Sequence, residues 1–159
     1  MNTWFHNSKD FLYPNLPYND VKPVGAADFY LAINATITFL EKKFGKSGVI
    51  DYFKEMAEKY YEPVIKLWKE NGLEGVRGYL DDFFRAEPNS SVTISNEPGK
   101  IVLKVKQCPA IHHLKKSGRV ISPLYCDQCR VINQTIADKS GIHFNIHGGM
   151  GECTQEFIK

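Results

Sequence analysis

The chain has 159 residues, of which 43% are hydrophobic and 24% charged, and its formal net charge is +2. This length and composition are typical of one soluble globular domain whose core is large enough to fold without disulfides or metal. The small net charge gives no electrostatic basis for binding nucleic acid, and the sequence lacks the ~20 consecutive apolar residues that span a membrane.

The N-terminus has no basic segment followed by an apolar run, so we expect no secretory signal. We therefore predict a cytoplasmic protein, in which thiols stay reduced. Residues 1–24 are rich in aromatic residues, Asn and Pro, which predicts an irregular arm packed onto the domain. The single domain, 1–159, would then consist of this arm, a helical half over 25–88 and a cysteine-bearing half over 89–159.

Three helices are predicted in the helical half, because apolar residues recur there every three to four positions. They cover about 26–44, 48–71 and 73–86. Gly45 is expected to end the first helix, and Pro63 to kink or divide the second. The apolar stripes are predicted to be core: Phe29, Ile33, Ile37, Leu40 and Phe44; Val49, Phe53, Met56, Tyr60, Val64 and Leu67; and Leu73, Val76, Leu80, Phe83 and Phe84.

The second half changes to the two-residue period of β-strands. It predicts one hairpin over 92–105 and a second whose Gly-rich turn, 148–151, leads into a last strand over 152–158. Two short helices are expected between the hairpins, over about 109–117 and 126–139. The predicted fold is α+β: N-terminal helices packed with a four-stranded antiparallel sheet made of two hairpins separated by two helices.

All four cysteines lie in this second half, at or near the ends of predicted elements. Cys108 follows the second strand, and Cys153 begins the last one. Cys126 and Cys129 form a Cys-x-x-Cys pair at the start of a helix. Ends of neighbouring elements can meet at one edge of a sheet, so we expect the four thiols to converge.

A cluster of this kind suggests either metal binding or nucleophilic catalysis. Four thiolates complete the tetrahedral set that zinc prefers, and the same residues would hold an iron–sulfur cluster. A cysteine at a helix N-terminus is instead a candidate nucleophile, because the helix dipole stabilises its thiolate. Cys108 and Cys126 occupy such positions, and Asp127 or a nearby histidine such as His112 would act as the acid or base. The candidate metal ligands are Cys108, Cys126, Cys129 and Cys153.

Other interpretations stay open at this point. Cys126 and Cys129 have the spacing of a redox dithiol, but that motif is expected in a βαβ unit, which the predicted element order lacks. Any single cysteine is also a small hydrophobe that can simply be buried. His143 and His147 alternate on one strand face and are expected to point to solvent.

Three cysteine motifs follow one another in a fixed order. A strand ends at Cys108 and leads through a short helix to Gly118, Cys126 opens the four-residue motif that ends at Cys129, and a Gly-rich turn precedes Cys153 and Phe157. In this order, and in the helical region 34–61, the chain resembles the L-2-amino-thiazoline-4-carboxylic acid hydrolase family.

The resemblance implies a small hydrolase that acts on a C–N or C–S bond of a thiazoline-like or amide-like molecule. It places Cys108, Cys126 and Cys153 in the site and gives the proton transfer to Asp127 or His112. The chain departs from the family at the fourth position of the middle motif, where Cys129 stands in place of an aspartate. This departure favours a thiolate site.

The element order also resembles the 4-vinyl-reductase-type small-molecule-binding domains, which carry cysteines late in the chain and bind hydrophobic ligands or metals. That second resemblance implies a ligand-binding or sensor domain whose four cysteines hold zinc or an iron–sulfur cluster. The expected partners are a small-molecule ligand or substrate and possible further copies of this chain. Neither nucleic acid nor a membrane is expected.

Overall fold

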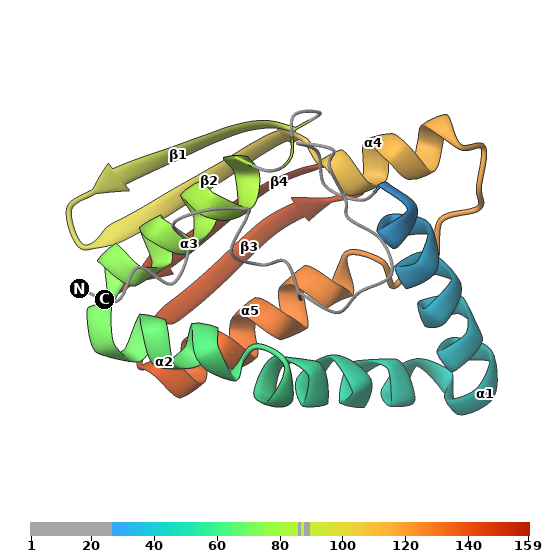
Figure 1. Cartoon of the computed structure of the whole chain (residues 1–159), viewed down its shortest axis with the longest axis horizontal. Coiled ribbons are helices and arrows are strands. Elements are labelled where there is room, and N and C mark those ends of the chain that lie inside the picture. Colours follow the sequence, from blue (N-terminus) through green and yellow to red (C-terminus); the bar gives the residue numbers. More distant parts are fainter. Residues whose placement is uncertain (1–26, 86, 88–89) are drawn as a thin grey trace, which may run out of the picture.

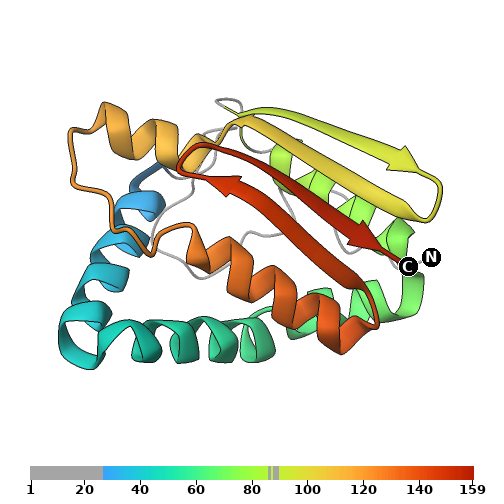
Figure 2. The ribbon, with the colours of Figure 1, turned by 180° about the vertical axis from the view of Figure 1, so that it is seen from behind.

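The protein is described by a computed structural model that covers residues 27–85, 87 and 90–159, seen from opposite sides in Figures 1 and 2. The packed arm predicted over 1–24 lies outside these residues. No helix in the described ranges is long and apolar enough to cross a membrane. The helices are α1 (Ala27–Lys59), α2 (Glu62–Asn71), α3 (Leu73–Arg85), α4 (Pro109–Lys116) and α5 (Asp127–Ser140). The strands are β1 (Ser91–Glu97), β2 (Lys100–Gln107), β3 (His143–Gly149) and β4 (Glu152–Ile158).

The four strands form one antiparallel sheet in the order β1-β2-β4-β3, so the two hairpins join through β2 and β4. This confirms the predicted α+β class. Cys153 lies on the central strand β4, with Val105 opposite it on β2 and Gly148 opposite it on β3. Two residues farther along β4, Gln155 has Leu103 opposite it on β2 and Ile146 opposite it on β3. The thiol of the last strand is therefore flanked by sheet on both sides.

Helices α3 and α5 pack against the sheet, and α1 and α2 lie against α5 (Figure 1). Trp68 of α2 is fully buried and packs against Phe157 of β4, with the ring centroids 5.3 Å apart. Helix α2 therefore also contacts the sheet. His143 and His147 on β3 are exposed, whereas Phe144 is buried and Ile146 half-buried, in agreement with the predicted alternation.

Within α1, two helical limbs meet at Gly45, at a corner in Figure 2, so the predicted end of the first helix there is confirmed. Gly45 has φ 70° and ψ −177°, a conformation essentially restricted to glycine, and the helix resumes directly after it. The predicted division near Pro63 is confirmed. Helix α1 stops at Lys59, and Pro63 lies in the first turn of α2, where its missing N–H costs little.

Four aromatic residues that were predicted to be core are exposed. The period of an α-helix does not match a fixed apolar repeat, so a long apolar stripe rotates gradually around the helix. Residues at the ends of the stripe therefore leave the helix face that packs against neighbouring elements. Phe44 directly precedes the bend, and Tyr60 lies in the break between α1 and α2. The exposed fractions are 62% for Phe29, 63% for Phe44, 74% for Tyr60 and 44% for Phe83. The middles of the stripes, including Ile37, Phe53 and Val76, are fully buried.

Candidate functional site

The cysteines lie at the element ends where the sequence predicted them. Cys108 caps the N-terminus of α4 directly after β2, with Pro109 as the first helical residue. Cys126 has the same place before α5, and Cys129 follows within the first turn of that helix. Cys153 is the second residue of β4. All four are free thiols.

The turn between β3 and β4, residues 148–151, contacts the starts of both helices. The backbone N–H of Cys108 donates to the carbonyl oxygen of Gly151 at 2.9 Å, and the backbone N–H of Met150 donates to Sγ of Cys126 at 3.1 Å. A Cβ on Gly148 would lie 2.5 Å from the carbonyl oxygen of Glu152, so this tight turn requires glycine there. The predicted hairpin turn thus brings β4 to the two cysteine-capped helices.

The thiols lie close enough for a charge on one to raise the pKa of another. Burial raises the pKa of Cys108, and charges on Cys126 and Cys153 raise it further. The backbone amides of Ala110 and Ile111, at the start of α4, lower this pKa but do not outweigh burial. The chain thus gathers Cys108, Cys126 and Cys153 at one end of the sheet.

Cys129 is the exposed member of the cluster. Protein atoms nevertheless crowd its thiol, and this crowding, with the charges of the other three thiols, raises its pKa. Burial and then a charge on Cys129 raise the pKa of Tyr125. Burial likewise raises the pKa of Tyr61 to about 12, with smaller contributions from Tyr60 and Cys129. Cys129 therefore lies on the side of the cluster that borders these tyrosines.

Cys153 is joined to a buried amide network. Nε2 of Gln155 donates to Sγ of Cys153 at 3.7 Å, and Nδ2 of Asn133 on α5 donates to Oε1 of Gln155 at 2.9 Å. Gln155 is only 5% exposed. Burial raises the pKa of Cys153, while the Gln155 hydrogen bond and the charge of Arg130 act against that increase. These two hydrogen bonds fix the Gln155 side chain next to the Cys153 thiol.

Neither predicted proton carrier is hydrogen-bonded to a thiol within the described part of the chain. Asp127 lies beside Cys126 but pairs with cations: its oxygens are 3.9 Å from Nζ of Lys46 and 3.8 Å from Nε of Arg130. His112 is exposed on α4. The roles of Asp127 and His112 therefore stay predictions.

Two polar groups near Cys108 escaped the sequence analysis. Among the described residues, the hydroxyl of Tyr30 and Nε2 of His113 are buried without a hydrogen bond of ordinary geometry, although Glu87 lies close to the Tyr30 hydroxyl; the two rings are 6.3 Å apart. Burial raises the pKa of Tyr30, and nearby Glu87 and Cys108 add to the increase. Buried polar atoms without partners are rare in proteins and suit a ligand that completes them. No local pattern marks Tyr30, because it contacts His113 only through the tertiary fold.

The cluster as it stands does not form a ready metal site. In the described ranges, no group of three or more His, Cys, Asp or Glu side chains is placed to hold a metal ion. The donor chemistry of four thiols suits zinc, but the described side chains do not surround one point as a zinc site requires.

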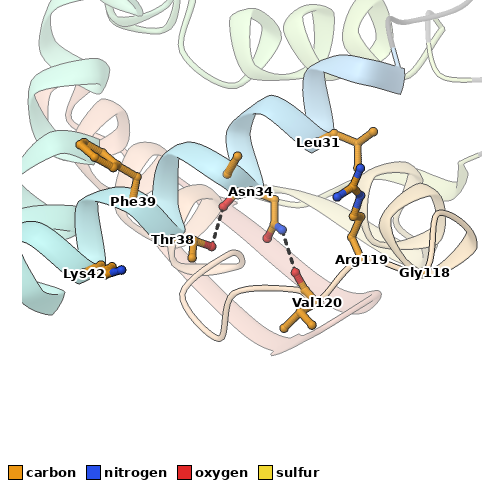
Figure 3. Close-up of a pocket in the computed structure, with 9 residues that line it drawn as sticks. Leu31, Asn34, Thr38, Phe39, Lys42, Gly118, Arg119 and Val120 are labelled. Atoms are coloured by element: carbon orange, nitrogen blue, oxygen red, sulfur yellow. Dashed lines mark hydrogen bonds between the residues drawn. The ribbon is translucent and has the colours of Figure 1, made fainter.

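A surface groove of about 810 Å³ lies apart from the thiols and contains none of the predicted site residues (Figure 3). The reactive groups are in the cluster, so the candidate active site is placed there. In comparisons with known proteins, no family model and no curated protein matches this chain.

Proposed function

We propose that this protein is a small hydrolase that uses Cys126 as a nucleophile on a C–N or C–S bond of a small molecule. The observation that carries the proposal is the hydrogen bond from the N–H of Met150 to Sγ of Cys126, at the N-terminus of α5. A helix N-terminus and a backbone N–H donor both stabilise negative charge that develops on a sulfur nucleophile. Met150 also has φ 53°, an uncommon conformation for a residue other than glycine.

The surrounding groups suit the later steps of such a reaction. The thiolate adds to an electrophilic carbon, a C–S bond to Cys126 forms, and the leaving nitrogen or sulfur departs with a proton. The proposal gives that proton transfer to Asp127 or His112, and water then hydrolyses the enzyme-bound intermediate. Burial keeps Cys108 and Cys153 protonated at neutral pH, so they are available as hydrogen-bond donors to the substrate.

The substrate class follows from the resemblance and from the unpartnered groups. The order of the cysteine motifs is similar to that of the thiazoline hydrolases, so a thiazoline-like or amide-like molecule is the first choice. The hydroxyl of Tyr30 and Nε2 of His113 would bind its polar atoms. The proposal includes a cytoplasmic location, where Cys126 stays reduced.

The first test is alkylation by iodoacetamide at neutral pH, followed by peptide mass spectrometry of reduced, metal-free protein. We expect Cys126 to react faster than the other three cysteines. Cys126→Ser should lower hydrolysis of 2-amino-thiazoline-4-carboxylate, or of an active small amide, by more than about a hundredfold while the circular dichroism spectrum is retained. Cys129→Ser is the matched control. Slower alkylation of Cys126 than of Cys129, or full hydrolysis by Cys126→Ser, would contradict the proposal.

The mutual closeness of the thiols supports a second candidate, a domain that binds zinc or an iron–sulfur cluster through Cys108, Cys126, Cys129 and Cys153. Ligand binding of the 4-vinyl-reductase type would then be its function. Elemental analysis and the ultraviolet–visible spectrum of anaerobically purified protein should give one metal centre per chain. A chelator should lower the melting temperature strongly, since metal binding contributes to folding. Metal-free protein from such a preparation excludes this candidate.

A further inference from the structure

The groove of Figure 3 lies between the first limb of α1 and the segment that links α4 to α5. Its wall is fixed by Asn34, which is only 7% exposed. Nδ2 of Asn34 donates to the carbonyl oxygen of Val120 at 2.8 Å, and its Oδ1 accepts from the N–H of Ser122 at 2.9 Å. Both ends of one buried amide therefore hold the linking segment against α1, and the groove is preformed.

The described lining of the groove carries positive charge. Arg119 lies beside Leu31 at one end, and Lys42 lies near Phe39 at the other (Figure 3). Among the described residues no acidic side chain lines it, and neither cation forms an ion pair with another residue of that part of the chain. At about 1.5 Å per helical residue, Leu31 and Lys42 are about 16 Å apart along the limb.

The surface between the two cations is apolar and accessible. Leu31, Ala35 and Phe39 follow one another at helical spacing along the groove. Phe39 is 57% exposed and Val120 is 90% exposed. Apolar side chains gathered beside unpaired cations suit a ligand with an apolar body and an anionic end.

We propose that this groove binds an anionic amphiphile, a carboxylate with a linear apolar chain. The guanidinium of Arg119 presents the planar pair of donors that a carboxylate accepts, so the head group lies there. The chain follows Leu31, Ala35 and Phe39 along α1. The aliphatic stem of Lys42 covers its far end, while the ammonium group stays in solvent and adds to the attraction. The volume of about 810 Å³ falls in the range of small-molecule sites.

The test is calorimetric titration of the full chain with dodecanoate below its micelle concentration, with neutral dodecanol as the matched ligand. We expect dodecanoate to bind more tightly and its affinity to fall with added salt. Arg119→Gln should weaken dodecanoate binding roughly tenfold or more, since it removes a charged hydrogen bond. Lys116→Gln, which removes an exposed cation on α4 outside the groove, should leave binding unchanged.

A second variant distinguishes weaker ligand binding from a defect in folding. Val120 is 90% exposed, so Val120→Glu keeps the core intact and should weaken dodecanoate binding by placing a negative charge at the groove. Equal binding by Arg119→Gln, Lys116→Gln and the unaltered protein would overturn the proposal. So would binding of dodecanol as tight as that of dodecanoate, or association with anionic vesicles but not with monomeric dodecanoate.

Discussion

Gln155 is a polar residue in the middle of an otherwise apolar sheet face, between Leu103 and Ile146. Alternation along the last strand predicts that Cys153, Gln155 and Phe157 share a face, and their burial agrees. The partner of Gln155 could not be predicted, because Asn133 reaches it from a helix whose rotation depends on packing. The same holds for Asn34, whose partners are more than 80 residues away.

Replacing Gln155 should show how strongly this network holds the core. Gln155→Leu leaves the Asn133 amide without its acceptor, so we expect the free energy of unfolding to fall by about 1–3 kcal/mol. In the double variant with Asn133→Leu, both partners are apolar, and the loss should be smaller than the sum of the single losses. Urea unfolding measures all three variants.

Gln134→Leu is the matched control, because Gln134 is exposed on the same helix as Asn133 and its change should stay within about 0.5 kcal/mol. Additive losses in the double variant would show that the two amides do not act together.

At the scale of elements, the positions of glycine and proline were the best predictors of where helices and strands begin or end. Pro63 correctly marked a division of the predicted second helix, and the Gly-rich turn 148–151 correctly marked a hairpin. Gly45 correctly marked the end of one helical limb, but the sequence could not show that the next limb resumes directly after it. The course of the chain after Gly45 depends on tertiary packing, such as that of α5 against α1.

The cysteine placements were predictable because they depend on these element boundaries. Cys108 and Cys126 cap helices, and Cys153 starts a strand, as the patterns indicated. Which thiol receives a hydrogen bond was not predictable. The contact between Met150 and Cys126 depends on how β3 and β4 meet α5, and no local signal specifies that.

For the molecule as a whole, buried tyrosine hydroxyls and cysteine thiols make the free energy of unfolding fall in the alkaline pH range. Burial raises the pKa of Tyr30, Tyr61, Tyr79 and Tyr125, so the folded state holds these protons more tightly than the unfolded chain. A raised folded-state pKa gives stability that is complete below the unfolded value and is lost as pH rises above it. For Tyr61 that loss extends from the ordinary tyrosine value of 10.0 to about 12.

We therefore expect the free energy of unfolding to fall as pH rises past about 10, as measured by urea titrations at several pH values. Tyr61→Phe should flatten this fall, because it removes one such phenol. Tyr60→Phe should flatten it much less, because Tyr60 is 74% exposed. Equal slopes for Tyr61→Phe and the unaltered protein would contradict this assignment.

The pairing of β2 with β4 at the centre of the sheet has a consequence for how the protein folds. Each hairpin joins strands that are neighbours in sequence, and such hairpins form within about 1–10 μs. The central pair instead closes a loop that contains α4 and α5, which is slower because distant segments must meet. We therefore expect Cys108, Cys126 and Cys153 to come together only at that late step. During folding, the thiols are thus separate and open to oxidants before the completed sheet shelters them.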